Sequence, residues 1–211
     1  MRKSLLGHIL LIGPSGSGKK TLARAIGYEL KTSVRLVTLN ELHSPGAVCA
    51  VLTSIHDGDV LIIENFDMIQ PECLELLYTA MKNFSLEFNI GKGTAARQFQ
   101  LDLPPFTLIA ISDKNKSVPT KIKECFYLNI SLSNYTTDEL IQLAKKWCDF
   151  NGVDIINNAS EKLSIYADGS NKKLVYALKR ARDFSMVINN KVIDLCVAEK
   201  TVDSLVNNDL S

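Results

Sequence analysis

The segment GPSGSGKKT, residues 13–21, has residue types and spacing that suit it to hold a phosphate group. A glycine-rich turn between a strand and a helix points backbone N–H groups at an anion, and Lys19 adds a positive charge for the terminal phosphates of a nucleotide. The full motif continues with Ser or Thr, whose hydroxyl ligates magnesium, whereas this chain has Lys20, so magnesium binding is doubtful. The predicted phosphate site comprises Gly13, Pro14, Ser15, Gly16, Ser17, Gly18, Lys19, Lys20 and Thr21.

Short apolar runs predict the buried parallel strands that must position this loop. The runs cover residues 8–13, 34–39, 59–65, 106–112 and 126–132, and segments of helical periodicity lie between most of them, at 19–31, 46–56 and 71–83. This alternation is typical of a doubly wound α/β sheet. We expect residues 1–133 to form this α/β domain.

An insertion interrupts the alternation before the fourth core strand. Residues 85–103 carry apolar side chains at every second position on both sides of a loop that contains two glycines. The pattern predicts a β-hairpin with one apolar face.

After about residue 133 the sequence becomes helical in character. Thr136 and Glu139 have the spacing of a capping box, and Gly152 is placed to end the helix that they begin. Trp147 falls on the apolar side of this helix and is expected in a core. Helical segments at 158–167, 171–187 and 191–206 follow, so we expect residues 134–211 to form a small all-α domain.

Composition excludes several classes of protein. The net charge of +1 gives no global electrostatic reason to bind nucleic acid. The five cysteines form no C-x-x-C pair and are interpreted as reduced thiols of a cytoplasmic protein, and His8, His43 and His56 lack metal-ligand spacing. No apolar stretch reaches the roughly 18 to 20 residues that a membrane-spanning helix needs.

Four blocks of this sequence resemble, in order and spacing, the AAA+ core of the RuvB family of Holliday-junction branch-migration motors. They are HILLIGPSGSGKKTLARAIGYEL, GDVLIIENFDMI, LYTAMKNFSLEFNIGKGTAARQFQLDLPPFTLIAIS and LVYALKRARDFSMV, and the resemblance covers roughly residues 7–188. It implies a five-stranded P-loop domain with a helical lid, an oligomeric ring and ATP hydrolysis between subunits. We expect the given residues to stop short of the family's C-terminal winged-helix domain, which grips DNA, so DNA contact is left open.

The resemblance also implies a protein partner for the hairpin. In the family this hairpin docks on RuvA, and here that role would fall to Leu86, Phe88, Ile90, Phe99 and Leu101. The alternative is a hairpin that packs only on its own domain. We favour partner docking, because an amphipathic hairpin that projects from a sheet must cover its apolar face.

Several positions depart from what the family uses for catalysis. The family's magnesium-ligating threonine is replaced by Lys20, and its Asp-Glu pair after the third strand is replaced by Glu64 and Asn65. Cys125 stands where an arginine would reach the neighbouring subunit. Lys172 replaces an arginine of the lid that contacts the γ-phosphate, and Ser112 or Asp113 falls at the nucleotide-sensing position.

These substitutions predict weak or no ATPase activity. Loss of a general base typically costs about 10² to 10⁴ in rate, and loss of an arginine finger about 10³ to 10⁵. The leading hypothesis is therefore a RuvB-like module that binds ATP or ADP, or serves assembly, without motor chemistry. Two alternatives remain open: an active, divergent ATP-dependent branch-migration helicase subunit that uses Glu64 as base, and a nucleotide-free interaction scaffold.

Overall fold

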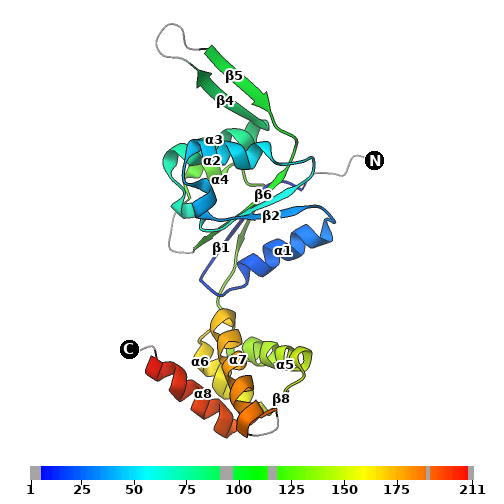
Figure 1. The fold of residues 1–211 in the computed structure, drawn as a ribbon, viewed down its shortest axis with the longest axis vertical. Coiled ribbons are helices and arrows are strands. Elements are labelled where there is room, and N and C mark those ends of the chain that lie inside the picture. The colour runs from blue at the N-terminus through cyan, green and yellow to red at the C-terminus, as the bar shows by residue number, and fades with distance from the viewer. Residues whose placement is uncertain (1–5, 91–96, 114–117, 189–190, 209–211) are drawn as a thin grey trace. The chain divides into compact units, whose positions relative to one another are not determined.

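The computed structural model describes residues 6–90, 97–113, 118–188 and 191–208 of the 211-residue chain. Contacts within it divide the chain into two compact units. The first unit comprises Met1–Gly13 and Lys19–Leu132, and the second comprises Pro14–Gly18 and Ser133–Ser211. Figure 1 shows the sheet and hairpin of the first unit and the helices of the second.

The first unit is built on a five-stranded parallel sheet with the strand order β2-β3-β6-β1-β7. Its strands are β1 (Ile9–Gly13), β2 (Val34–Val37), β3 (Val60–Ile63), β6 (Thr107–Asp113) and β7 (Leu128–Ser131). All five predicted strands are confirmed, and the sheet is the predicted α/β type. Because the strands are parallel, their carboxyl ends meet at one edge, which is where a phosphate loop after β1 must lie.

Alternate residues of the strands feed two separate apolar cores. Leu10, Leu61 and Leu108 pack in the cluster that α2 (Pro45–Thr53) and α3 (Pro71–Asn83) cover. Ile9, Val60 and Ile109 pack in the cluster on the other face, with α1 (Lys19–Glu29). This alternation follows from the two-residue period of a strand, and burial on both faces explains why the strands are almost entirely apolar.

Local signals fix the helices of this unit. Ser44 caps α2 by accepting a hydrogen bond from the backbone N–H of Ala47 at 3.3 Å, and Pro45 occupies the first turn. A Cβ added to Gly27 in α1 would overlap with Val34 of β2, so glycine is required for α1 to approach the sheet edge. The short elements are the 3₁₀ turns η1 (Leu39–Leu42) and η2 (Phe66–Met68) and the helix α4 (Thr120–Lys123).

The predicted hairpin is confirmed as β4 (Ser85–Ile90) and β5 (Arg97–Asp102). The register pairs Leu86 with Leu101 and Phe88 with Phe99, which puts these positions on the same side of the ribbon. In Figure 1 the hairpin extends away from the sheet. Leu86 at its base is nevertheless fully buried and belongs to the core of the first unit.

The second unit contains four helices and a two-stranded parallel pair in its described part. The elements are α5 (Thr137–Asn151), β8 (Asp154–Ile155), α6 (Asn157–Ala167), α7 (Asn171–Ile188), β9 (Val192–Ile193) and α8 (Leu195–Asn208). The predicted capping box of Thr136 and Glu139 begins α5, and Gly152 ends it in the left-handed conformation. Trp147 packs against the apolar core, as predicted. The β8–β9 pair was not predicted, because two-residue strands carry no periodicity.

Candidate functional site

The loop Pro14–Gly18 joins β1 to α1 and has the backbone that a phosphate cradle requires. Gly16 and Gly18 have φ values of +86° and +87°, which side chains with a Cβ adopt only with strain. The hydroxyl of Ser17 is buried and has no hydrogen-bond partner among the residues that the structure describes. A buried hydroxyl between two left-handed glycines is a donor that suits an anion.

The same loop packs against the start of α7, within the second unit. The backbone N–H of Asn171 donates to the carbonyl of Gly16 at 3.1 Å. A Cβ added to Gly16 would overlap with the hydroxyl of Ser170 and would come 3.4 Å from the Cβ of Lys172. The structure therefore brings Lys172 beside the predicted phosphate loop.

In the first unit, Lys19 lies at the carboxyl edge of the sheet and is almost fully buried. Its ammonium donates to the carbonyl of Gly13 and lies 3.3 Å from a carboxylate oxygen of Asp113, the last residue of β6. Because β1 and β6 are neighbouring parallel strands, their register sets Gly13 beside Asp113 and gives Lys19 both partners. Lys19 is thus fixed at the point where the loop meets the sheet.

Lys20 forms an ion pair with Glu64 across the same edge. Its Nζ lies 3.0 Å from Oε1 and 3.1 Å from Oε2 of Glu64, so both carboxylate oxygens are engaged. The side chain of Lys20 is 45% exposed and that of Glu64 is 25% exposed. Lys20 is the second residue of α1, and Glu64 directly follows β3. The two residues carry opposite charges but are 44 positions apart, so no local pattern in the sequence indicates that they meet.

Asn65, the residue after Glu64, is exposed and has a left-handed backbone with φ of +51°. Asparagine tolerates this conformation better than most residues with a side chain. Its carbonyl accepts a hydrogen bond from the N–H of Met68 at 2.8 Å, which closes the 3₁₀ turn η2. The amide side chain has no proton-accepting group of the strength that a general base needs.

Asp67 and Ser112 form a contact that the sequence interpretation missed. Asp67 lies in η2, past the end of β3, and its carboxylate accepts a hydrogen bond from the buried hydroxyl of Ser112 at 2.8 Å. It also accepts from the N–H of Asp113 at 3.4 Å. Asp67 therefore braces the end of β6, because the 3₁₀ turn η2 brings its carboxylate back to that strand.

Cys125 lies after α4, half-buried against the core of the first unit. Its thiol lies 3.9 Å from the carbonyl of Lys121. Burial raises the pKa of this thiol, the nearby Lys82 opposes that shift, and Glu124 adds to it. A thiol in this environment is kept protonated and makes a poor nucleophile.

The residues at this edge fit a phosphate group better than a magnesium ion. Lys19, which is buried and begins α1, brings a positive charge that suits an anion. Magnesium takes oxygen ligands, but Lys20 offers only N–H donors, and it already occupies both oxygens of Glu64. In the parts of the chain that the structure describes, no three His, Cys, Asp or Glu side chains are grouped as a metal site.

The hairpin residues predicted to contact a partner differ in accessibility. Leu101 is 46% exposed, whereas Leu86 is fully buried in the core. Leu86 must be corrected from a docking residue to a core residue, because its side chain anchors the hairpin to its own domain. The side chains of Phe88, Ile90 and Phe99 lie outside the described residues.

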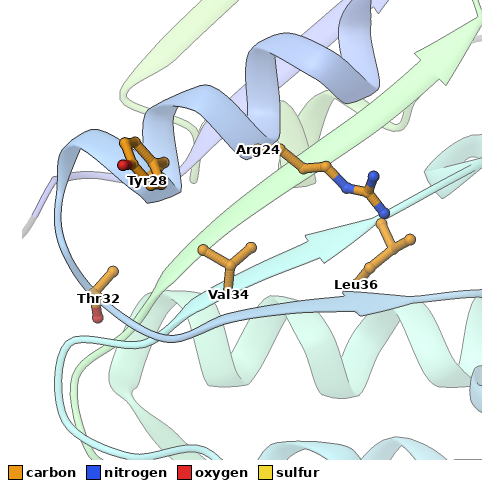
Figure 2. A pocket seen from close by; sticks show the side chains of 5 residues that line it. All are labelled: Arg24, Tyr28, Thr32, Val34 and Leu36. Carbon is orange, nitrogen blue, oxygen red and sulfur yellow. The ribbon is translucent and has the colours of Figure 1, made fainter.

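A separate hollow of about 360 Å³ lies between α1 and the edge strand β2 (Figure 2). Arg24, Tyr28, Thr32, Val34 and Leu36 line it. Tyr28 lies eight residues after Lys20, which places it roughly 12 Å along the helix from the phosphate loop. The hollow is therefore not part of the site at the carboxyl edge.

None of the helices within the described residues has the length and apolar character needed to cross a membrane.

Comparison with known proteins places this geometry in a family. The RuvB Holliday-junction branch-migration motor of Thermotoga maritima is 30% identical and superposes with a TM-score of 0.82, over 95% of this chain and 62% of that protein. A point mutant of the same motor gives 29% identity and a TM-score of 0.85, over 95% and 63% of the two chains. This chain thus spans somewhat less than two thirds of the length of those proteins. Residues 1–132 match the family model described as the Holliday junction DNA helicase RuvB P-loop domain. The fold is the RuvB AAA+ fold, and the chain belongs to the RuvB P-loop family.

Proposed function

We propose that this chain is a RuvB-like subunit that binds ATP or ADP and serves assembly, and that it does not hydrolyse ATP at the rate of a motor. Membership of a P-loop family implies nucleotide binding. The observation that carries the rest of the proposal is the ion pair between Lys20 and both carboxylate oxygens of Glu64.

The ion pair supports the loss of hydrolysis for two reasons. In P-loop enzymes the position of Lys20 supplies a hydroxyl to magnesium, and an acidic residue after the third strand helps to hold the ion. Here both positions are engaged with each other. A carboxylate whose two oxygens are both engaged by an ammonium must also give up that partner before it can accept a proton from water.

The neighbouring substitutions support the same proposal. Asn65 stands where the resemblance implies the glutamate that activates water, and an amide cannot take that proton. Cys125 stands where it implies an arginine for the adjacent subunit, and such an arginine is worth about 10³ to 10⁵ in rate. These losses do not multiply within one site, but any one of them lowers turnover to near background.

Turnover measurements on the full chain test this proposal. We expect binding of ATP and ADP, with turnover below about 0.1 per second, a hundredfold less than a typical enzyme at roughly 10 per second. The double variant Lys20→Thr plus Asn65→Glu restores the two chemical groups and should raise turnover. Lys82→Thr plus Asn83→Glu makes the same two changes at exposed positions of α3 and its end, and should leave turnover unchanged.

Each rival function has a distinct result in this experiment. Turnover above about 0.1 per second in the unmodified chain would support an active, divergent ATPase and contradict the proposal. Absence of ATP and ADP binding at millimolar concentration would support a nucleotide-free scaffold.

For the hairpin, we propose docking on a RuvA-like protein through the exposed side of β5, and assembly of the subunit into a ring. The exposed apolar side chain of Leu101 supports this surface, whereas Leu86 is left out of it. Leu101→Asp should abolish binding to purified RuvA without lowering thermal stability. Gln100→Asp is the matched control, because Gln100 is the exposed neighbour on the other side of the strand. Unchanged RuvA binding by Leu101→Asp would contradict the docking proposal.

A further inference from the structure

We propose that the site accepts nucleotide in its metal-free form, with Lys20 as the built-in counter-charge in place of magnesium. This inference rests on the proposed nucleotide-binding function and specifies the chemical form of the ligand. The side chains at the carboxyl edge of the sheet do not offer the unoccupied oxygen ligands that a magnesium ion requires.

The three carboxylates that the structure describes at the ends of β3 and β6 already have partners. Glu64 is held by Lys20 through both oxygens, and Asp113 accepts from Lys19 at 3.3 Å. Asp67 accepts from the hydroxyl of Ser112 at 2.8 Å. A magnesium ion would have to displace one of these donors, and it retains its own water ligands strongly.

Lys20 also opposes a cation by its own charge. The ammonium carries no lone pair, so it cannot ligate a metal. It is the second residue of α1, one position after Lys19, and so it projects from the helix start that a phosphate loop uses. A divalent cation bound at that place would be repelled by the ammonium, whereas a phosphate oxygen would be attracted.

The exposure of Lys20 lets it serve a ligand. Its side chain is 45% exposed, and an exposed ion pair contributes little to stability because solvent screens it. Lys20 can therefore turn from Glu64 toward a phosphate oxygen, or contact both groups, without disturbing the core. The buried Lys19, by contrast, remains fixed by Gly13 and Asp113.

The charge of the ligand then decides which form binds better. A metal-free nucleoside di- or triphosphate presents its full negative charge to Lys19, Lys20 and the helix start. Its magnesium complex carries two fewer negative charges and brings a cation to the region that Lys20 occupies. We therefore expect magnesium to compete with binding rather than support it.

Isothermal titration calorimetry tests this inference. The affinity of the full chain for ADP and for ATP is measured once in excess EDTA and once in millimolar free magnesium. The unmodified chain should bind each nucleotide in EDTA, and magnesium should weaken binding several-fold. Lys20→Thr should reverse the preference, losing about tenfold in EDTA and binding better with magnesium. Glu64→Gln should tighten metal-free binding, because it removes the carboxylate that competes for Lys20.

Lys82→Thr is the matched control, since it removes an exposed lysine of α3 and should keep the metal-free preference. Thermal melting of each variant checks that it is folded. A loss of tenfold or more in affinity when EDTA replaces magnesium, unchanged by Lys20→Thr, would overturn this inference and leave the proposed function standing. If the unmodified chain binds neither nucleotide in EDTA or in magnesium, and so behaves like the Lys19→Ala variant, both the inference and the nucleotide-binding function are contradicted.

Discussion

The interior of the sheet and its carboxyl edge are parts of the same strands, yet they obey different physical constraints. Ile62 and Ile63 of β3 are completely buried, whereas Glu64, the next residue, is 25% exposed and carries a charge. Within one or two residues the chain passes from close-packed core to solvent-screened polar groups. A smaller side chain in the core leaves a cavity and lowers the free energy of unfolding. Replacement of an exposed charged side chain at the edge changes the charge of the site and has little effect on stability.

This contrast separates the residues that specify the RuvB fold from those that line the carboxyl edge of its sheet. The residues that specify the sheet are apolar and buried on both faces. Lys20, Glu64 and Asn65 lie where the sheet ends, and none of them contributes a side chain to a core. The fold therefore places little restriction on their identity, and the chemistry of the site can diverge.

The largest expected effect is at Phe66, which is the interior residue of the turn η2. Its ring is fully buried and packs edge-to-face on Phe126 with a centroid distance of 5.7 Å. Phe66→Ala should lower the free energy of unfolding by about 3–5 kcal/mol, because it leaves a cavity under the site. Urea denaturation measures this. Met68→Ala, at a position 52% exposed in the same turn, should lower the free energy of unfolding by less than about 1 kcal/mol. Equal losses of stability in the two variants would contradict the difference between buried and exposed positions.

An intermediate effect is expected from the pH dependence of stability at His8. This ring is buried between β6 and α3: it accepts from the N–H of Leu108 at 2.9 Å, so its other nitrogen donates to the carbonyl of Met81 at 3.0 Å. Burial lowers the pKa of His8 below 6.5, and the bond to Met81 only partly opposes this. The ring is thus neutral in the folded state.

The sign of the effect follows from these protonation states. Below pH 6.5 the unfolded chain binds the proton and the folded chain does not, so stability is complete above pH 6.5 and falls as the pH decreases toward the folded-state pKa. The loss is at most about 1.4 kcal/mol per pH unit from this group. Urea midpoints at pH 7.5 and 5.0 should differ less in His8→Gln than in the unmodified chain. The matched control His56→Gln, at an exposed position, should keep the full difference.

The smallest effect on stability is expected at the edge itself. Lys20→Met and Glu64→Gln each break the ion pair and should change the free energy of unfolding by less than about 1 kcal/mol, because both side chains reach solvent. Chemical denaturation measures both variants. A loss above about 2 kcal/mol would show that the pair is a structural element, and the separation between core and edge would fail.

The sequence alone determined the elements and their order. The apolar runs predicted all five sheet strands, the alternation around two glycines predicted the hairpin, and the spacing of Thr136 and Glu139 predicted a helix start. These features depend on residues close together in the chain, so local periodicity and capping rules reveal them. The roles assigned to the site residues stay predictions, since they depend on a ligand.

Only the tertiary structure decided which distant side chains meet. Lys20 and Glu64 are 44 residues apart, and Ser112 and Asp67 are 45 residues apart; each pair meets because parallel strands end at one edge. The burial of Leu86 depends likewise on the core beneath the hairpin. Periodicity says which side of an element is apolar, but strand order and packing decide what that side contacts, and here they place the Lys20 ammonium beside the Glu64 carboxylate.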